Sequence, residues 1–398
     1  MFKKLLKFYI IIFKSLDYIY PKNSKLVVFS QANNRYSDNS RELFKSMCHN
    51  DYYKAVWLVD NKKTETKILK DLPGAKIVFR YTLQGLLLTL NAKYVILSHG
   101  FGDMKLYSFI SSNTHVIMLW HAITLKNVGI LDKKYDLTTI NKFLSNETSR
   151  YSLIISSSSV DKFMISGCLG IDARKALVTG LPRNDRYLSR PLKKDFDFTN
   201  SKIELKIPTN LLMKKIILYA PTFRDFGVTE FFPFEDFNID ALVDKLKKED
   251  AYLLIRPHQN DFKNQEKIEL LVDVSYGHVL FAGNREIPDV AELLPFVDVI
   301  VTDYSSIYID LLLKDIPPIF LPYDLEEYER ARGLAYDYEL ITPGPKIFTQ
   351  KDFIVAIEDA FKGAPKYKEQ RLFVKKMFHK YDDGKACERI AQAMKELT

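Results

Sequence analysis

A chain of 398 residues exceeds the size that one hydrophobic core usually supports, so two domains of ordinary size are expected. With 47% hydrophobic and 27% charged residues, the composition is that of a globular protein and excludes extensive disorder. The formal charge of +8 favours an anionic partner, either nucleic acid, lipid headgroups or phosphorylated substrates, without selecting among them. Cys48, Cys168 and Cys387 are odd in number and far apart, which argues against a disulfide framework and indicates a reducing cytosol.

The first 20 residues are basic and amphipathic. Their longest apolar run, Phe8 to Phe13, is bounded by Lys7 and Lys14, whereas a membrane-spanning helix needs about 20 apolar residues. Segment 1–20 therefore predicts a helix lying on a membrane surface, with packing on the protein's own core as an equally weighted alternative. No small-residue cleavage site follows, which argues against a signal peptide.

Short β-branched or aromatic runs alternate with longer amphipathic stretches from residue 25 onward. In the first half the runs are KLVVFS, KAVWLV, KIVFR, YVILSH, HVIMLW and SLIISS, and in the second half they are KKIILYA, AYLLIRPH, HVLFA, FVDVIVTD and PPIFLPYD. Such alternation predicts an α/β protein in which βα units surround parallel sheets. We expect a first Rossmann-like domain at 21–190, a linker at 191–213, a second at 214–375 and a C-terminal helix at 376–398.

The segment VDVIVTDYSSIYIDLLLKD, residues 297–315, carries polar side chains where a strand gives way to a helix. Ligands of open parallel sheets bind beyond the carboxyl ends of the strands. The hydroxyls of Ser305 and Ser306, with the free amides of the helix start, suit a diphosphate, and Asp310 suits ligand hydroxyls. The alternative is that the serines only cap the helix and Asp310 lies on the surface.

Two basic motifs follow other strands of the second half, YAPTFRD at 219–225 and IRPHQND at 255–261. Arg224 and Arg256 could offer paired donors to phosphate oxygens, Thr222 a hydroxyl, and His258 a hydrogen bond or a proton to the leaving phosphate. Equally, Arg224 could pair with Asp225, and a lone histidine is more often structural.

In the first half, HVIMLWHAITLK places His121 after a strand, with Lys126 soon after it. A histidine there suits removal of a proton from an attacking hydroxyl. His99 in LSHGFGD is a rival for that role, with Asp103 available to orient or replace it. His99, Asp103 and Lys126 are therefore candidates for the acceptor side. Arg183, in the TGLPRND turn, completes the candidates, and a capping or core role is the alternative for each histidine.

Several common chemistries lack their usual motifs. The sequence contains no GxxxxGK[ST] loop, no GxGxxG after the first strand, and no HExxH or CxxC. We therefore expect no ATP-binding P-loop, no nicotinamide cofactor and no metal ligands among the site residues.

Taken in order, the motifs resemble those of the CDP-glycerol glycerophosphotransferase family, which builds teichoic acids. The resemblance runs from about Val27 to Ile390, and it rests on SDNS, LWHAITLK, TGLPRND, YAPTFRD, IRPH, VTDYSSIYID, FLPYDLEEYERARGLAYDYELITPGP and FHKYDDGKACERI. It implies a GT-B-like fold of two Rossmann-like domains facing a cleft, with the acceptor on the first, the CDP donor on the second, and the last helix returning to the first.

The resemblance also implies residue roles. His121 occupies the family's base position, and the donor-binding positions fall on Arg183, Thr222, Arg256, His258, Ser305, Ser306 and Asp310. One departure stands out, because the family usually has WHGTPLK where this chain has Ala122 and Thr124.

We therefore predict transfer of a polyol phosphate, glycerol phosphate in preference to ribitol phosphate, from a CDP-polyol to a polyprenyl-diphosphate-linked glycan or growing polymer. CMP is released, no cofactor is required although Mg²⁺ is compatible, and a priming enzyme is favoured over a polymerase. The expected location is the cytoplasmic face of an anionic membrane, without nucleic acid. The alternatives are a GT-B glycosyltransferase using a nucleotide sugar and a nonenzymatic nucleic-acid or membrane-binding protein.

Overall fold

The computed structural model describes residues 2–191, 193–196, 207–258, 261 and 264–397. The chain forms two compact units, each built from separated segments. The first unit comprises Met1–His121, Gly129–Arg186 and Asp383–Thr398, and the second comprises Ala122–Val128 and Tyr187–Asp382. Residues 192 and 197–206 of the predicted linker lie outside the described residues.

The first unit is built on a seven-stranded parallel sheet in the order β3-β2-β1-β4-β5-β6-β7. Its strands are β1 (Asn23–Phe29), β2 (Lys54–Val59), β3 (Ile77–Phe79), β4 (Ala92–Leu97), β5 (His115–Met118), β6 (Leu153–Ser156) and β7 (Ala176–Val178). The order reverses between β1 and β4, which makes the carboxyl ends of these two strands the topological switch point.

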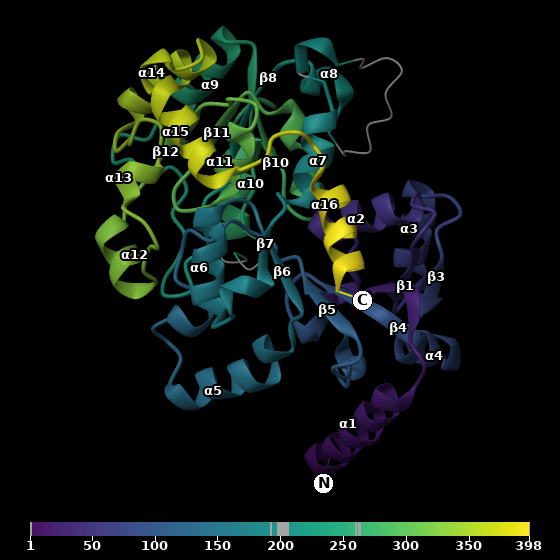
Figure 1. Ribbon diagram of the computed structural model, residues 1–398. Coiled ribbons are helices and arrows are strands. Elements are labelled where there is room, and N and C mark those ends of the chain that lie inside the picture. The colour runs from purple at the N-terminus through teal and green to yellow at the C-terminus, as the bar shows by residue number, and fades with distance from the viewer. Residues whose placement is uncertain (1, 192, 197–206, 259–260, 262–263, 398) are drawn as a thin grey trace. The chain divides into compact units, whose positions relative to one another are not determined.

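Helices flank this sheet, as Figure 1 shows. They are α1 (Phe2–Ile19), α2 (Asp38–Cys48), α3 (Lys62–Asp71), α4 (Leu83–Asn91), α5 (Leu137–Asn146), α6 (Ser159–Leu169), α7 (Pro182–Ser189), which crosses the boundary between the units, and α16 (Ala386–Glu396). The hydroxyls of Tyr53 and Tyr94 donate to the carbonyls of Ala391 and Met394, at 2.7 and 2.8 Å, so the C-terminal helix packs on the first unit.

The second unit contains a five-stranded parallel sheet in the order β10-β9-β8-β11-β12. Its strands are β8 (Lys215–Tyr219), β9 (Ala251–Ile255), β10 (Val279–Phe281), β11 (Val299–Thr302) and β12 (Pro318–Phe320). Its helices are α8 (Thr209–Leu212), α9 (Ile239–Lys248), α10 (Gln265–Asp273), α11 (Ile307–Leu312), α12 (Leu325–Ala331), α13 (Tyr338–Ile341), α14 (Gln350–Phe361) and α15 (Lys368–Phe378). The switch point lies between β8 and β11, and the prediction of an α/β protein with parallel sheets is confirmed.

Helix α1, at the bottom of Figure 1, packs on the first unit. Tyr9 and Phe13 lie against Phe109, with ring centroids 6.2 and 5.4 Å apart, and the buried carboxylate of Asp17 accepts the backbone N–H of Ser111 at 2.7 Å. Exposed apolar side chains among the described part of the helix include Phe8, Ile11, Ile12, Leu16 and Ile19. The two alternatives for segment 1–20 are therefore compatible, because the helix packs on its own protein and still presents apolar side chains to solvent.

No helix within the described residues combines the length and the apolar character needed to cross a bilayer.

Candidate active-site residues in the two units

A buried aspartate joins the strand ends at the switch point of the first unit. Asp103 accepts the backbone N–H of Ala32, beyond β1, at 2.8 Å, and those of Ser98 and His99, beyond β4, at 2.7 and 2.9 Å. Burial alone raises the pKa of Asp103, but hydrogen bonding and charge from His99 outweigh burial and hold the pKa below its usual range. Asp103 therefore fixes the backbone, and its side chain is fully buried.

The two histidines that the sequence offered as rival bases lie together. The rings of His99 and His121 stack with centroids 4.6 Å apart, and Nδ1 of His99 lies 3.7 Å from a carboxylate oxygen of Asp103. Nδ1 of His121 lies 3.4 Å from the carbonyl oxygen of Ser98. A carbonyl only accepts, so this long contact favours a proton on Nδ1 and leaves the lone pair of Nε2 to receive one.

Burial, followed by the neighbouring His99, lowers the pKa of His121 to about 3. The free imidazole is therefore neutral at physiological pH, which is the form that a general base requires.

Residues of α2 and α7 hold the turn that carries His121 through hydrogen bonds. Trp120 has a left-handed backbone (φ 53°), which is uncommon for a bulky residue. The side-chain amide of buried Asn39 donates to the carbonyl of Trp120 at 3.0 Å, and its oxygen accepts the backbone N–H of Arg183 at 3.1 Å. The guanidinium of Arg183 in turn donates to the carbonyl of His121 at 2.7 Å and to Asp38 at 3.2 Å.

Arg183 was predicted to bind the donor, and the structure gives it a different set of contacts. Its guanidinium contacts the carbonyl of His121 within the first unit, and its donor-binding role stays a prediction. Ala122, which replaces the family's usual glycine, is not among the residues with positive φ, so alanine fits its backbone without strain.

Lys126 was predicted on the acceptor side, but its segment, Ala122–Val128, belongs to the second unit. The segment pairs with residues 333–335, since Asn127 N–H donates to the Gly333 carbonyl at 3.2 Å and Ala335 N–H donates to Leu125 at 2.9 Å. Gly333 has φ +82°, and a Cβ there would lie 2.4 Å from the Asn127 amide, so a side chain would push this segment away.

The ammonium group of Lys126 lies 5.9 Å from the ring of Tyr328 and forms no hydrogen bond or ion pair with a described residue. Burial lowers its pKa to about 8, against the charge of Asp303. Lys126 is therefore a cation in the second unit that is available for an anion.

A second buried aspartate joins the strand ends at the other switch point. Asp303, directly after β11, accepts the backbone N–H of Thr222, beyond β8, at 2.8 Å, and that of Tyr304 at 2.5 Å. Thr222 is 7% exposed, and among the described residues its hydroxyl has no hydrogen-bond partner. An unpaired buried hydroxyl is costly, so its presence at a switch point indicates a ligand contact.

Arg224 was predicted to contact a donor phosphate, and its surroundings do not favour that role. The side chain is 1% exposed and forms a two-point pair with Asp324, at 2.6 and 2.8 Å, and an ion pair with Asp303 at 2.9 Å. The rings of Tyr304, Tyr323 and Tyr328 surround its guanidinium at 4.9 to 5.1 Å. The alternative pairing of Arg224 with Asp225 is also wrong, because Arg224 pairs with Asp324 and Asp303 instead.

The strand end of β9 presents Arg256 and His258. Arg256 donates to the carbonyls of Ala282 and Ile287 at 2.9 and 2.8 Å, so it shapes the loop after β10, and burial lowers its pKa to about 10. His258 is exposed and stacks on Phe223 with centroids 5.5 Å apart. It adjoins residues 259–260, which lie outside the described residues.

The loop after β11 leads into α11, which has six residues. Ser306 is its N-cap residue, Ser305 is partly exposed, and the Ser305 hydroxyl accepts the Ile307 N–H at 3.5 Å. Asp310 is 3% exposed, which excludes the predicted surface alternative. Burial, and then the charge of Asp310, raises the pKa of Tyr187, so this carboxylate faces the interior of the second unit.

Across the parts of the chain that the structure describes, no three His, Cys, Asp or Glu side chains come together as a metal-binding group.

Three residues that organise these sites were not among the sequence candidates: Asn39, Asp303 and Asp324. Asn39 lies in the SDNS element and Asp324 in the PYD element. Both therefore belong to sequence motifs, but the sequence did not indicate their role. Asp303 was recognised only as the end of a strand.

Known proteins resemble the chain over nearly its whole length. A family model described as CDP-glycerol:poly(glycerophosphate) glycerophosphotransferase matches residues 12–396. A teichoic acid glycerol-phosphate transferase of Staphylococcus aureus is 28% identical over 389 residues, which cover 94% of this chain and 93% of that protein. A teichoic acid poly(ribitol-phosphate) polymerase of Bacillus spizizenii is 32% identical over 292 residues, which cover 71% of this chain and 43% of that protein.

Among solved structures, the wall teichoic acid polymerase TagF has a TM-score of 0.72 at 24% identity, covering 96% of this chain and 92% of that chain. This likeness shows the fold, which is GT-B-like as predicted. The family model, which spans the motifs as well as the fold, confirms the resemblance seen in the sequence: the chain is an enzyme that belongs to the CDP-glycerol:poly(glycerophosphate) glycerophosphotransferase family.

Proposed function

We propose that the enzyme transfers glycerol phosphate from CDP-glycerol to a hydroxyl of a polyprenyl-diphosphate-linked glycan, in teichoic acid or related polymer synthesis. The family match supports the donor, and the Staphylococcus aureus relative, named a teichoic acid glycerol-phosphate transferase, supports the pathway. The observation that carries the chemistry is the neutral His121 after β5, whose Nδ1 faces a carbonyl and whose Nε2 is left to accept a proton.

In the reaction, an acceptor hydroxyl attacks the phosphorus that bears the glycerol. The bond from this phosphorus to the oxygen bridging the two phosphates breaks, and CMP leaves with that oxygen. His121 Nε2 receives the hydroxyl proton, and the product carries a glycerol phosphodiester. His99, stacked on His121 and next to Asp103, orients the imidazole, so we assign it to the acceptor side as a positioning residue.

The second unit supplies the donor contacts in this proposal. Lys126 offers an unpaired ammonium group, Thr222 an unpaired hydroxyl, and Ser305 and Ser306 partly exposed residues at the carboxyl edge of the sheet. Phosphoryl transfer depends mainly on positioning and on charge stabilisation, which a lysine and several hydroxyls provide. His258 is proposed to reach the leaving phosphate from β9. The scheme needs no protein-bound metal and is compatible with Mg²⁺ carried by the diphosphate.

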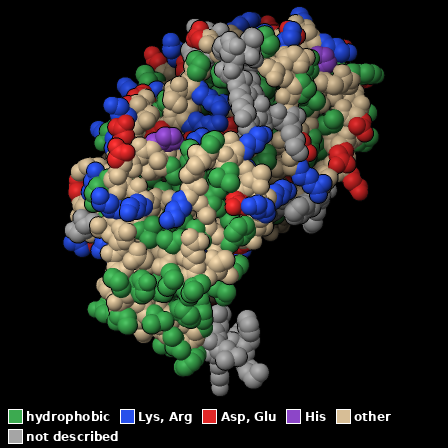
Figure 2. All heavy atoms as spheres, turned by 90° about the vertical axis from the view of Figure 1, so that its right-hand side faces the viewer, with side chains coloured by type: hydrophobic (Ala, Val, Ile, Leu, Met, Phe, Trp, Pro, Cys, Tyr) green, Lys and Arg blue, Asp and Glu red, His purple; other side chains and the backbone are tan. Residues whose placement is uncertain are grey.

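We also propose that the enzyme works at the surface of an anionic membrane on the cytoplasmic side. Figure 2 shows hydrophobic side chains gathered at the lower end of one face, over α1 and α4. The exposed side chains of these two helices include Ile11 and Ile19 of α1 and Leu83 of α4, at 63%, 75% and 71%. A basic amphipathic helix with an open apolar face is typical of interfacial binding.

For the product, we propose a priming reaction that adds one or few units. The relatives include a teichoic acid glycerol-phosphate primase of Bacillus subtilis, 28% identical and covered over 77% of its length. They also include polymerases at similar identity, so product length measured by mass spectrometry at excess donor is the test.

The experiment that tests the proposed function measures CMP release from CDP-glycerol, CDP-ribitol and a panel of nucleotide sugars with a lipid-linked disaccharide acceptor, with and without EDTA. We expect turnover of CDP-glycerol, and loss of turnover in His121→Ala. His49→Ala, which removes an exposed histidine of the same unit, is the matched control and keeps full activity. Turnover of a nucleotide sugar alone would overturn the phosphotransfer scheme.

A further inference from the structure

A polar cavity lies in the first unit beside α1, at the opposite end of β5 from His121. Its volume is about 310 Å³. It is bounded by Lys14 of α1, by residues 110–116 leading into β5, by residues 149–152 leading into β6, and by Lys175. Because His121 follows the carboxyl end of β5 whereas Thr114 precedes its amino end, the cavity is separate from the proposed reaction centre.

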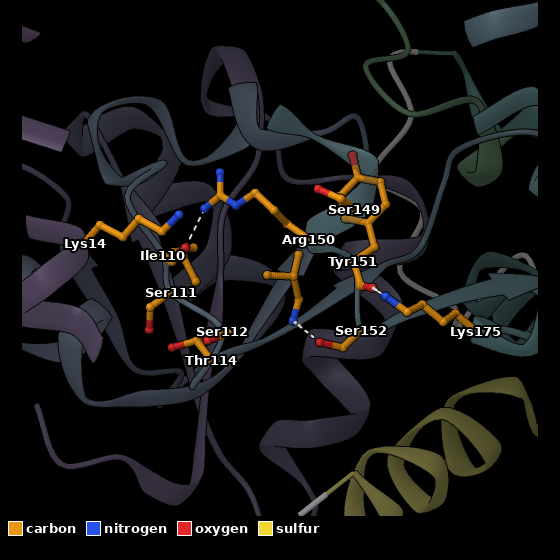
Figure 3. A pocket seen from close by; sticks show the side chains of 11 residues that line it. Lys14, Ile110, Ser111, Ser112, Thr114, Ser149, Arg150, Tyr151, Ser152 and Lys175 are labelled. Atoms are coloured by element: carbon orange, nitrogen blue, oxygen red, sulfur yellow. Dashed lines mark hydrogen bonds between the residues drawn. The ribbon is translucent and has the colours of Figure 1, made fainter. Parts of the chain in front are cut away.

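The lining of this cavity suits a phosphate group. Lys14, Arg150 and Lys175 contribute three cations, the serine and threonine residues are Ser111, Ser112, Thr114, Ser149 and Ser152, and no carboxylate is among the described lining residues. The carboxylate of Asp17 lies behind this lining, where it accepts from Ser111 and Thr114. Figure 3 shows Lys14 and Arg150 on facing sides of the cavity. Lysine and arginine donors combined with hydroxyls are typical of phosphate recognition.

The cations of the cavity differ in how firmly they are held. Arg150 donates to the carbonyls of Ser108 and Ile110, at 2.8 and 2.5 Å, and stacks on Phe101 at 3.8 Å, so its charge is fixed. Lys175 donates to the Tyr151 carbonyl at 3.0 Å and keeps two further N–H donors. Lys14 makes no hydrogen bond or ion pair with any described residue, so its ammonium group is open to an anion.

The position of Lys14 identifies the source of that anion. Lys14 belongs to the helix whose apolar side chains are exposed, with Phe8 at 64% and Ile11 at 63%. Asp17 anchors the same helix to the unit through Ser111, which itself lines the cavity. A ligand phosphate in the cavity would therefore lie beside apolar side chains suited to acyl chains, as the headgroup of a membrane lipid does.

We propose that this cavity binds the phosphate of an anionic lipid headgroup and thereby fixes the orientation of the enzyme on the membrane. This inference rests on the membrane location given in the proposed function and adds a defined lipid site to it. Each lysine near an anionic surface strengthens binding by about 1 kcal/mol, which is a factor of roughly five in partition coefficient.

The test is cosedimentation of the full-length enzyme with two kinds of vesicle. One contains phosphatidylcholine alone, and the other contains phosphatidylcholine with about 30% phosphatidylglycerol. Ser149→Glu places a carboxylate in the cavity, and Ser145→Glu, four residues earlier and also exposed, makes the same charge change outside it. Lys14→Gln is compared in the same way with Lys63→Gln, an exposed lysine of α3. We expect about fivefold weaker binding to the anionic vesicles for the two cavity variants and no change for the two controls.

Equal losses in all four variants would overturn the site in favour of diffuse charge attraction. Binding of inorganic phosphate or glycerol phosphate in solution, with vesicle binding unaffected by Ser149→Glu, would also overturn it in favour of a free phosphate site. CMP release with a water-soluble acceptor separates this inference from the proposed function, because it stays unchanged in the cavity variants. A wild-type enzyme that turns over CDP-glycerol but binds neither kind of vesicle would overturn the membrane location together with the lipid site.

Discussion

Replacing Asn39 by alanine is expected to slow the chemical step far more than it weakens substrate binding. Asn39 makes three hydrogen bonds to the backbone around His121, to Leu119 at 3.4 Å, Trp120 at 3.0 Å and Arg183 at 3.1 Å. At a net value of about 1 kcal/mol each, their loss removes about 3 kcal/mol of support. The left-handed backbone of Trp120 costs about 1–2 kcal/mol, which is less than that support, so we expect the turn to relax without it.

The relaxed turn displaces the imidazole of His121, and a displacement of about 1 Å can cost roughly a hundredfold in rate. The assay is CMP release from CDP-glycerol, with kcat and KM determined separately, so that a fall in kcat at constant donor KM identifies misplacement of the base. Tryptophan fluorescence gives a second readout, because the chain has only two tryptophans and Trp120 is one of them.

The matched control is Asn61→Ala, which removes an asparagine that caps α3 by accepting the Thr64 N–H at 2.9 Å. It should cost about 1 kcal/mol of stability and leave kcat unchanged. An Asn39→Ala enzyme with normal kcat and normal tryptophan fluorescence would refute the reasoning, because the turn would then hold its shape without the clamp.

Three further predictions concern charged groups. Because the pKa of His121 is lowered to about 3, the acid limb of kcat/KM against pH is expected well below the ordinary histidine value of about 6.5. Lys126 loses its proton as pH rises through about 8, so the KM for CDP-glycerol should rise there, and Lys126→Met should raise it about tenfold at pH 7 and remove this pH dependence. Arg224→Met leaves buried Asp303 and partly buried Asp324 without their cation, and urea unfolding should report a loss of about 3–5 kcal/mol, which Arg224→Lys restores only in part.

The strands could be predicted from sequence because they are buried on both faces and therefore appear as continuous apolar runs. Each of the eleven runs coincides with a strand of one or the other sheet, in the predicted order. The strand that was missed, β7, has only three residues, Ala176–Val178, and one of them is exposed. So short a run carries too little periodicity to be distinguished from a turn.

The strand-end positions of the candidate residues were predictable from the sequence, whereas their roles stay predictions. Strand-end position identified His99, His121 and Thr222 correctly as neighbours of the switch points, since that rule depends on topology alone. It could not show that Arg224 pairs with two carboxylates, because its main partner, Asp324, is a hundred residues away. Nor could it show that the chain passes from the first unit to the second directly after His121, since no composition change marks that point.

Both sheets use a buried aspartate to pair the backbone amides beyond their strand ends. At a switch point, the chains that follow two adjacent strands lead to opposite faces of the sheet. The backbone amides beyond the strand ends then have no hydrogen-bond partner on a neighbouring strand, and a buried amide must be paired. A carboxylate supplies the pairing, Asp103 for the loops after β1 and β4 and Asp303 for the loops after β8 and β11. The charge that this leaves behind is then balanced differently, by the edge of His99 in the first unit and by Arg224 in the second. Histidine is the partner in the unit where we propose proton transfer, and arginine is the partner in the unit proposed to hold a diphosphate, while each aspartate fixes the geometry of its strand ends.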